Sequence, residues 1–487
     1  MPTTTLTRAD RHTLGINARK QLARSAHCVF DRKGCPHQPL DILHQSMQGR
    51  MPNLIELKYQ RMAASAFGFF RGAVPIMAAD LAAHPSTGIV TQICGDAHVR
   101  NLGAYGAPDG RLVFDINDFD ESIRAPFEWD IKRLATSLIV AGRDSGIRRR
   151  ARHAAVATFT ARYRKAMRDF ASMPVLELAH FQVHRIAQVA PVMAVLKAAE
   201  RATPQRSLEA LTETGVSQTV TKTKHAHPAP PVPRRFKSEP PLLQRVTGAE
   251  AQLVLDALIP YARTLAPERR HFLAQYHPID VAFKVVGTGS VGLRDYCIYF
   301  EGNAAWAFAA SHAPDSTDRS SASWDLKGPV SDPLFLQLKE EPASAYAAYL
   351  PENASGRAHN GHRVADGQRA MQLTSDPFLG YTTIDGRDYL VRQLNDHKAS
   401  LDLSTLTADS LCAYADLCGE LLARGHARAG DPVAIAAYIG NSARFDDAIL
   451  AFAHTYANQT EADWKALVKS LKKRPAKKAP KAASPKA

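Results

Sequence analysis

A long interruption in the residue pattern limits what this chain can fold into more than any other feature of the sequence. Residues 203–247 contain the run PAPPVPRRFKSEPP and a stretch rich in Thr, Lys and His, and neither shows helical or strand periodicity. Proline removes a backbone donor and fixes φ, so such a segment does not continue a helix or a central strand. We therefore predict a flexible Pro-rich linker or loop, with folded parts on both sides of it.

The two sides of this break differ in periodicity. Upstream, apolar residues recur at helical spacing apart from two strand-like runs, at Ile89–Cys94 and Arg111–Ile116. Downstream, residues 281–301, 333–340 and 388–394 alternate as strands do, before helical spacing returns. This order predicts an α+β protein of two lobes. The predicted divisions are an N-terminal extension (1–40), a helical lobe (41–202), the linker (203–247), a β-rich lobe (248–400), a C-terminal helical segment (401–466) and a disordered basic tail (467–487).

A net charge of +14 is typical of proteins that bind nucleic acid, but this charge is not spread evenly along the chain. Eight of the positive residues lie between Lys469 and Lys486, where there is no acid, so the rest of the chain carries 14 − 8 = +6. We expect this Ala-, Pro- and Lys-rich tail to be disordered and solubilising. It could also touch nucleic acid or anionic lipid through non-specific charge.

The composition is that of an ordinary globular protein, with 45% apolar and 22% charged residues. No run approaches the ~20 apolar residues of a membrane-spanning helix. The first thirty residues lack the apolar core of a secretory signal. The six cysteines form no CxxC pair, so neither a zinc ribbon nor a disulfide framework is indicated. We expect a soluble, cytoplasmic protein with reduced thiols.

Polar chemistry concentrates in one acidic segment, Cys94–Glu121. It opens with C-G-D-A-H-V-R-N and closes with F-D-I-N-D-F-D-E. Carboxylates at this density repel one another unless a cation, arginines or water neutralises them, and oxygen ligands suit Mg²⁺ better than zinc. We predict a Mg²⁺–phosphate site; the alternative is that the acids cap turns and pair with nearby arginines. The candidate residues are Asp96 and His98 for catalysis, and Asn101, Asp115, Asp118 and Asp120 for the metal.

A second group of phosphate-binding features lies nearly two hundred residues downstream. The glycine turn, V-V-G-T-G-S-V-G at 285–292, would let backbone N–H groups approach phosphate oxygens, but a plain hairpin turn also explains it. Lys339 ends a predicted strand and could hold nucleotide phosphates, with Glu340, Glu341 or Asp366 as its acidic partner. The candidate nucleotide-binding residues are Gly287, Gly289, Ser290, Gly292, Lys339 and Arg392.

The start of the acidic segment resembles the catalytic loop H-G-D-x-H-x-x-N of the aminoglycoside-phosphotransferase and choline-kinase group of kinase-like enzymes. This resemblance implies that Asp96 is the base and that Asn101 binds metal. N-D-F-D at 117–120 is similar to the group's I-D-F-D, which would make Asp118 the principal metal ligand. P-F-E-W-D, ending at Asp130, resembles the turn whose aspartate braces the catalytic loop.

The order of these motifs differs from that group, in which the glycine loop and the lysine precede the catalytic loop. The resemblance therefore implies a kinase-like, two-lobed fold that is circularly permuted, unless the two halves resemble kinase parts by chance. From about residue 15 to residue 466 the chain also resembles the uncharacterised bacterial family called domain of unknown function 2252. The matching stretches include F-G-F-F-R-G (67–72), P-F-E-W-D-I-K-R-L-A (126–135), Y-L-V-R-Q-L-N-D-H-K (389–398), H-A-R-A-G-D (426–431) and Y-A-N-Q-T (456–460).

These features predict an ATP- and Mg²⁺-dependent phosphotransferase whose partners are a nucleotide and an unknown small-molecule or protein acceptor with a hydroxyl group. One alternative is a nucleotide-binding regulatory protein without transfer activity. Another is a metal-dependent phosphohydrolase, in which the acids of the segment bind two cations and activate water. The last alternative is a protein that binds nucleic acid through its basic tail.

Overall fold

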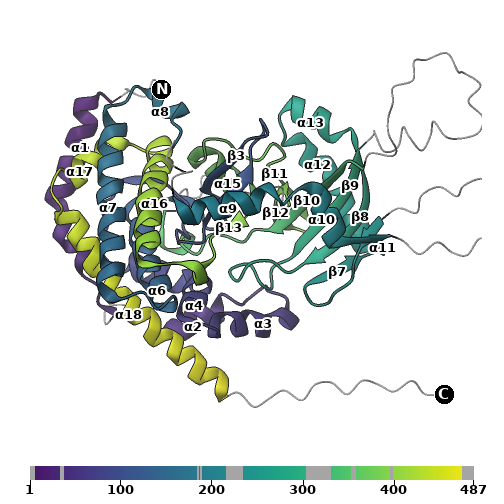
Figure 1. Ribbon diagram of the computed structural model, residues 1–487, viewed down its shortest axis with the longest axis horizontal. Helices are drawn as coiled ribbons and strands as arrows, with labels where there is room; N and C mark the ends of the chain where they lie inside the picture. The colour runs from purple at the N-terminus through teal and green to yellow at the C-terminus, as the bar shows by residue number, and fades with distance from the viewer. Residues whose placement is uncertain are drawn as a thin grey trace, which may run out of the picture.

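The chain is α+β, as predicted, and its helices and its largest sheet occupy different sides of the molecule. Figure 1 shows helices gathered on one side and a six-stranded antiparallel sheet on the other. Residues 6–200 and 399–473 form the helical part, and residues 203–394 form the sheet part. The computed structural model describes residues 6–32, 38–183, 186, 189–214, 234–302, 331–351, 358–394 and 399–473.

The helical part is built around α6 (Glu128–Asp144), whose residues 128–142 are all buried. Beside it, α7 (Arg149–Ser172) and α16 (Ala408–Ala429) pack so closely that a Cβ on Gly419 would lie 2.4 Å from the carbonyl oxygen of Phe159. Their apolar faces join one large hydrophobic core. The other described helices of this part are α1 (Arg8–Gln21), α2 (Pro39–Gln45), α3 (Pro52–Ala63), α4 (Ala66–Gly72), α5 (Val74–Ala82), α8 (Val175–His180), α9 (Ala190–Glu200), α17 (Pro432–Ile439) and α18 (Arg444–Lys472), with 3₁₀ turns η1 (Arg24–Cys28) and η6 (Leu403–Thr405).

The predicted N-terminal extension packs into the helical part in the structure. Helix α1 crosses α17 at Gly15, where a Cβ would lie 2.2 Å from the carbonyl oxygen of Ala434. Arg19 Nε and Arg24 Nη1 donate to the carbonyl oxygens of Tyr438 (2.8 Å) and Ile439 (2.7 Å), which end α17. Side chains that satisfy the last carbonyls of a helix stabilise its C-terminus. The N-terminal residues therefore cap and stabilise the C-terminal end of α17.

Short strands carry the acidic segment through the helical part. The predicted strands at 89–94 and 111–116 are confirmed as β1 (Val90–Ile93) and β3 (Leu112–Ile116). β1 pairs with β4 (Ile123–Pro126), and β3 pairs with β2 (Leu102–Gly106). Strand β2 was not among the predicted strands, because L-G-A-Y-G is short and contains two glycines.

The sheet part holds the predicted β-rich strands in one antiparallel sheet of order β11-β12-β10-β9-β8-β7. Helices α11, α12 and α13 cover one face of this sheet, with Tyr261 fully buried between them and the strands. The elements are β7 (Leu243–Val246), α11 (Gly248–Asp256), α12 (Leu258–Arg263), α13 (Pro267–Leu273), β8 (Tyr276–Lys284), β9 (Asp295–Gly302), β10 (Pro333–Glu340), η4 (Ala347–Tyr349), α15 (Asn360–Met371), β11 (Gly380–Ile384) and β12 (Arg387–Gln393).

The segment predicted as a flexible linker, 203–247, contains regular structure at both ends. These ends form α10 (Pro204–Leu211), β5 (Thr212–Thr214), β6 (Arg234–Phe236) and β7, while residues 215–233 lie outside the described residues. Thr203 caps α10 by accepting from Arg206 N at 3.3 Å, and Leu208 and Phe236 are buried against the sheet. The individual elements are too short for their periodicity to stand out among the prolines.

Strand alternation places Lys339 on the face of the sheet opposite α11–α13. In β10, Leu334, Leu336 and Leu338 belong to the core under those helices. Successive side chains of a strand point to opposite faces, so Gln337 and Lys339 face the helical part. Lys339 pairs in register with Asp295 of β9 and Leu390 of β12.

After β12 the chain returns to the helical part, where β13 (Ala399–Ser400) pairs with β2, next to the acidic segment.

The last helix extends further than the sequence predicted. Helix α18 runs to Lys472 and buries Leu467, so the boundary predicted for the basic tail at 467 is too early; residues 474–487 lie outside the described residues. In the described ranges no helix combines the length and the apolarity needed to cross a bilayer.

Candidate functional site

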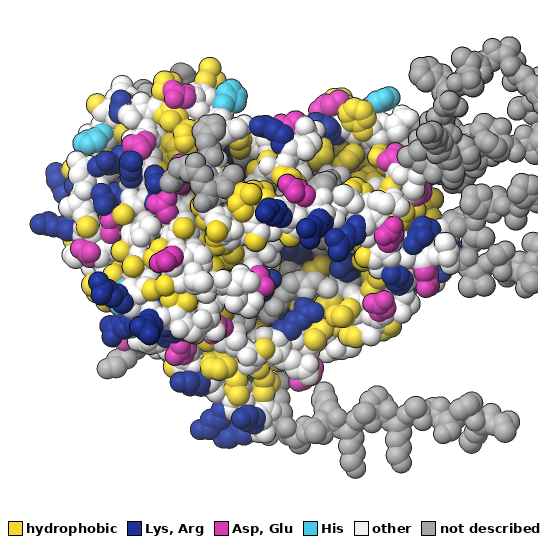
Figure 2. Space-filling view, in the orientation of Figure 1, with side chains coloured by type: hydrophobic (Ala, Val, Ile, Leu, Met, Phe, Trp, Pro, Cys, Tyr) yellow, Lys and Arg dark blue, Asp and Glu magenta, His cyan; other side chains and the backbone are white. Residues whose placement is uncertain are grey.

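A cavity of about 370 Å³ lies where the helical part meets the sheet part. The acidic segment and helices α3–α5 contribute one side of it, and the glycine turn, β10 and β12 contribute the other. Figure 2 shows the surface hollowed between the two parts, with Lys and Arg side chains beside the hollow. The charged residues that line the cavity are Arg50, Lys58, Arg71, Arg100, Lys284, Lys339 and Arg392, and Asp96, Asp118, Asp120, Glu121 and Glu341.

Asp96 is held at the cavity by a buried arginine. The turn that presents it needs glycine, because Gly95 has a φ of +78° and a Cβ there would lie 2.2 Å from the carbonyl oxygen of Glu121. Nε and Nη2 of Arg133 lie 2.8 and 2.5 Å from Oδ1 of Asp96, and Arg133 also donates to the carbonyl oxygen of Phe70 at 3.1 Å. Burial raises the pKa of Asp96 to about 7, and the Arg133 guanidinium opposes this rise.

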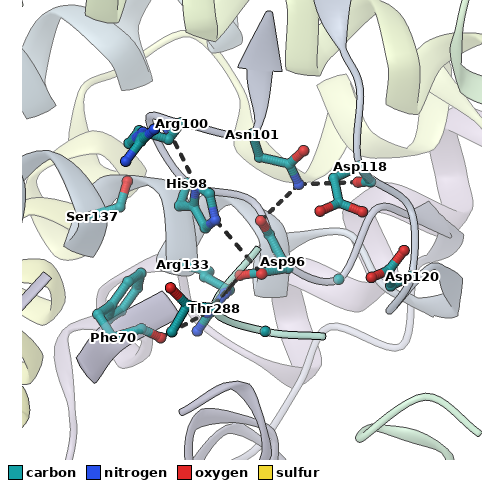
Figure 3. Close-up of polar contacts among 12 residues, drawn as sticks. Phe70, Asp96, His98, Arg100, Asn101, Asp118, Asp120, Arg133, Ser137 and Thr288 are labelled. Atoms are coloured by element: carbon teal, nitrogen blue, oxygen red, sulfur yellow. Dashed lines mark hydrogen bonds and ion pairs between the residues drawn. The ribbon is translucent and has the colours of Figure 1, made fainter. Parts of the chain in front are cut away.

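His98 faces the second oxygen of Asp96, as Figure 3 shows. Its Nε2 lies 3.6 Å from Oδ2 of Asp96, and its Nδ1 accepts a hydrogen bond from the backbone N–H of Arg100 at 3.1 Å. Burial lowers the pKa of His98 well below its usual value, and the neighbouring Arg71 and Arg133 lower it further. His98 is therefore neutral at pH 7, with its proton on Nε2 directed at Asp96.

Asp130 braces the backbone that carries Asp96. Its two carboxylate oxygens accept from the N–H groups of Cys94 (2.8 Å) and Gly95 (3.0 Å), so the contact that the resemblance implied is present. His426 of α16 places Nε2 3.3 Å from Asp130, and Tyr163 of α7 bonds to the other ring nitrogen at 2.8 Å. Three helices thus fix the position of one loop.

Asn101 links the two ends of the acidic segment. Its Nδ2 donates to the carbonyl oxygens of Asp96 (2.8 Å) and Asp118 (3.0 Å), as drawn in Figure 3. Its Oδ1 is buried without a hydrogen-bond partner among the described residues, and the same holds for Oδ1 of Asp120. The Asp120 oxygen and the half-exposed Asp118 carboxylate are ligands of the kind that Mg²⁺ takes, whereas Asn101 is absent from the described lining of the cavity. The described ranges hold no preformed group of three or more His, Cys, Asp or Glu side chains arranged to bind a metal.

Asp115 lies apart from the other candidate metal residues. It is buried, pairs with the guanidinium of Arg424 on α16, and is absent from the described lining of the cavity. That Asp115 binds metal stays a prediction. In the structure its ion pair with Arg424 joins β3 to α16.

Lys339 joins the two halves of the predicted site. Its Nζ contacts Oδ2 of Asp120 and lies 3.7 Å from Oδ1 of Asp118. Ser290 of the glycine turn donates to the same Asp120 oxygen at 3.1 Å. Burial opposes the charge on Lys339, but Asp118 and Asp120 outweigh it and raise the pKa. Residues more than two hundred positions apart in the chain thus share one ion-pair network.

Of the three acids considered as partners of Lys339, only Glu341 lines the cavity among the described residues. Glu340 pairs with Arg294 (3.2 Å) and Arg387 (2.9 Å), and Asp366 lies beside His362 on α15. Both carboxylate oxygens of Glu341 are buried without a hydrogen-bond partner in the described part of the chain. Burial and the nearby Asp120 raise the pKa of Glu341 well above its usual value, against the influence of Lys339.

The glycine turn is held by basic residues from the helical part. The buried Lys58 of α3 donates to the carbonyl oxygens of Thr288 (3.1 Å) and Gly289 (2.6 Å), and Arg61 donates to that of Val286 at 2.6 Å. Burial lowers the pKa of Lys58 well below its usual value. With its carbonyl groups engaged on this side, the turn presents Gly287, Gly289 and Ser290 to the cavity.

The structure brings most of the predicted site residues together. Arg392 lines the cavity and donates to the carbonyl oxygen of Asn117 at 3.3 Å. Gly292 lies at the end of the glycine turn, where its carbonyl oxygen accepts from Met51 N. Sequence reasoning missed Arg133 and Lys58. The position of Arg133, three residues after Asp130 on one helix face, was a usable signal; Lys58 offered none, because its partners are backbone atoms far along the chain.

Comparison with known proteins places most of the chain in one family. A family model described as "Uncharacterized protein conserved in bacteria (DUF2252)" matches residues 50–307 and 325–470. The match includes both the acidic segment and the glycine turn with Lys339. No curated protein matches the chain, and no solved structure matches it.

Proposed function

This chain belongs to the DUF2252 family of uncharacterised bacterial proteins, whose description carries no activity, and we propose from the site that it is an ATP- and Mg²⁺-dependent phosphotransferase. The observation that carries the proposal is the network in which Lys339 and Ser290 meet Asp120 and Asp118 beside Asp96. Phosphoryl transfer needs a base for the acceptor, a metal ligand, and cationic and backbone groups for the phosphates. The cavity holds side chains of each kind.

Asp96 is the proposed base. It stands at the cavity with Oδ1 committed to Arg133, so Oδ2, which His98 Nε2 faces at 3.6 Å, is the oxygen that would accept the proton of an acceptor hydroxyl. A pKa of about 7 suits a group that takes up a proton near neutral pH. The acceptor oxygen would bond to the γ-phosphorus of ATP as its proton passes to Asp96, while the bond to the bridging oxygen breaks and ADP leaves with the electron pair.

Asp118 and Asp120 are the proposed carboxylate ligands for Mg²⁺, with Asn101 as an amide ligand. The ion would neutralise charge on the phosphates. An Mg²⁺ ion bound chiefly by nucleotide phosphates needs only one or two protein carboxylates, so a preformed cluster is unnecessary. Lys339, which contacts both acids, would exchange them for phosphate oxygens, and the glycine turn would offer its N–H groups.

The arrangement supports a kinase-like, two-lobed fold in permuted order. The glycine turn joins the first two strands of a meander, β8 and β9, and the lysine lies on the third, β10, as in protein kinases. The helix that follows, α15, carries no acid that reaches Lys339; its Arg363 donates to the carbonyl oxygen of Asp120 at 3.0 Å. We propose that Glu341, two residues beyond Lys339, takes the place of the helical acid.

Calorimetric titration of the full chain with ATP, with and without Mg²⁺, tests the proposal. We expect binding that depends on Mg²⁺ and that both Asp118→Ala and Lys339→Ala weaken. Asp109→Ala, on an exposed hairpin, is the matched control and should bind as the wild type does. Absence of ATP binding under both conditions would refute the proposal. Binding without transfer to any acceptor would favour a regulatory protein, and release of phosphate to water alone would favour a hydrolase.

A further inference from the structure

A second hollow, of about 440 Å³, adjoins the cavity at Arg71 and Arg100, which line both. Its wall is formed by the end of α3, the start of α4, the end of α6 and the glycine turn. Four residues of its described lining carry hydroxyl groups: Ser65, Ser145, Thr288 and Ser404. The charged residues of its described lining are Arg61, Arg71, Arg100 and Asp144.

The charge around this hollow is unbalanced. It has three guanidinium groups, from Arg61, Arg71 and Arg100, and no ion pair joins any of them to an acid in the described part of the chain. The acid in its described lining, Asp144, already accepts the N–H of Phe67 at 3.1 Å. Like charges crowded without a partner cost free energy unless an anion offsets them.

Arg71 is the residue that most clearly lacks a ligand. Its Nε is buried without a hydrogen-bond partner among the described residues. Burial lowers the pKa of Arg71, and the neighbouring Arg100 lowers it further, while Asp96 and Asp118 oppose this. A buried guanidinium N–H without an acceptor is costly, so this atom favours a bound anion.

Resting on the function proposed above, we propose that this hollow binds the acceptor, and that the acceptor is a small alcohol that already carries a phosphate or a carboxylate. Arg71 and Arg100 would hold that anion, since a guanidinium fork matches both groups. Arg100 follows Asp96 by four residues, so one short loop carries both the anion contact and the base. Ser65, Ser145 and Thr288 would face the hydroxyl groups of such a compound.

Titration of the full chain with inorganic phosphate and, separately, with acetate at constant ionic strength tests the subsite. We expect binding to weaken about tenfold in Arg100→Gln, the loss of one charge-assisted hydrogen bond, and the same dependence on Arg100 to persist when Lys339→Met is also present. Arg124→Gln removes an exposed charge outside both hollows and should behave as the wild type does. Stronger binding of phosphate would indicate a phosphorylated acceptor, and stronger binding of acetate a carboxylate.

Two results would overturn the inference. One is that the wild type binds neither anion. The other is that Lys339→Met abolishes anion binding while Arg100→Gln leaves it intact, because the anion would then occupy the nucleotide site. ATP titration of the same variants separates the two proposals: if ATP does not bind but anion binding depends on Arg100, the anion site stands and the phosphotransferase fails. Arg100 is exposed and its side chain donates no hydrogen bond within the described ranges, so its replacement leaves the fold intact.

Discussion

At the scale of single residues, one face of α6 controls the geometry of Asp96. Asp130 binds the backbone before Asp96, and Arg133, one turn later, binds its carboxylate. Residues three apart share a helix face, so any shift of α6 moves both contacts together. The guanidinium of Arg133 lies 4.3 Å from the centre of the Phe70 ring, which restricts its movement further.

Replacing Asp96 by Asn tests its assigned role. We expect phosphoryl transfer to fall by about 10²–10⁴-fold, because the amide cannot take up a proton, while Mg²⁺-dependent ATP binding is retained. The measurement is transfer of labelled phosphate from ATP to a pool of small alcohols or, without acceptor, to water. Asp109→Asn is the control for the same chemical change at an exposed site. Full transfer by Asp96→Asn would remove Asp96 from the mechanism.

Residue spacing alone located the acids of the site but did not assign their partners. Asp96 and Asp118 were found because each stands at a fixed offset in a short motif. Asp115, three residues before Asp118, has the same side chain but is bound by Arg424, about three hundred residues further along the chain. The sequence could not separate these acids, since the difference is the neighbour that the fold supplies.

At the scale of elements, α3 acts as a support for the glycine turn. Lys58 and Arg61 of α3 direct their cations at carbonyl oxygens of the turn, and Arg50, two residues before α3, donates to that of Val291 at 2.7 Å. Glycine-rich turns are conformationally free, so these contacts fix a segment that its own sequence would leave mobile.

Lys58→Met removes this support with little change of volume. Two carbonyl oxygens lose their donor, so we expect the free energy of unfolding to fall by about 1–3 kcal/mol. Hydrogen exchange should quicken at residues 286–292 and stay unchanged in β10. Lys165→Met, on the exposed face of α7, is the control. Unchanged exchange in the turn would show that Lys58 does not hold it.

Gly15→Ala tests the packing of α1 on α17. Alanine in a helix is normally stabilising relative to glycine, but here its methyl group would lie 2.2 Å from the carbonyl oxygen of Ala434. We expect urea denaturation to show a loss of about 1–3 kcal/mol, as for other overpacked interfaces. Thr13→Ala, on the exposed side of α1, should cost less than about 1 kcal/mol. A stabilised Gly15→Ala protein would mean that α1 does not pack this way.

Elements with a long, clean pattern were predictable, and short ones were not. The strands β9, β10 and β12 run over seven or eight residues and were predicted from their apolar residues. Strands β2 and β7 have five and four residues, and their pairing partners rather than their own residues define them.

At the scale of the whole molecule, the cavity exists only where both parts meet. Contacts from the sheet part hold the acidic segment, including Ser344 Oγ to the carbonyl oxygen of Glu121 at 2.9 Å and Ala345 N to its carboxylate at 2.7 Å. The sequence predicted the content of each part. It could not place the parts against each other, because these contacts join residues more than two hundred positions apart.

A buried histidine makes the stability of the protein sensitive to pH. His27 of η1 is 1% exposed, bonds to the hydroxyl of Tyr438 at 2.8 Å, and has its pKa lowered by burial to about 3. The unfolded chain binds a proton here below pH ~6.5 and the folded chain does not, so stability falls as pH falls through this window. Between pH 7 and pH 5 the loss should be about 2 kcal/mol.

Urea denaturation at both pH values measures this loss. His27→Gln keeps a donor for Tyr438 but cannot be protonated, so we expect its free energy of unfolding to fall by about 2 kcal/mol less than that of the wild type over the same range. His12→Gln, exposed on α1, should keep the full pH dependence of the wild type. An equal pH dependence of wild type and His27→Gln would show that His27 is not the group responsible.

The contact between α1 and α17 also sets the order in which the protein can complete itself during synthesis. A ribosome releases Gly15 more than four hundred residues before Ala434, which at about 5–20 residues per second is a delay of roughly 20–80 s. All strands of the six-stranded sheet leave the ribosome within that interval, whereas α1 waits for the helices made last. The nascent chain could therefore form this sheet before α1 packs on α17, and the face of α1 that awaits α17 is the one that a chaperone would have to shield.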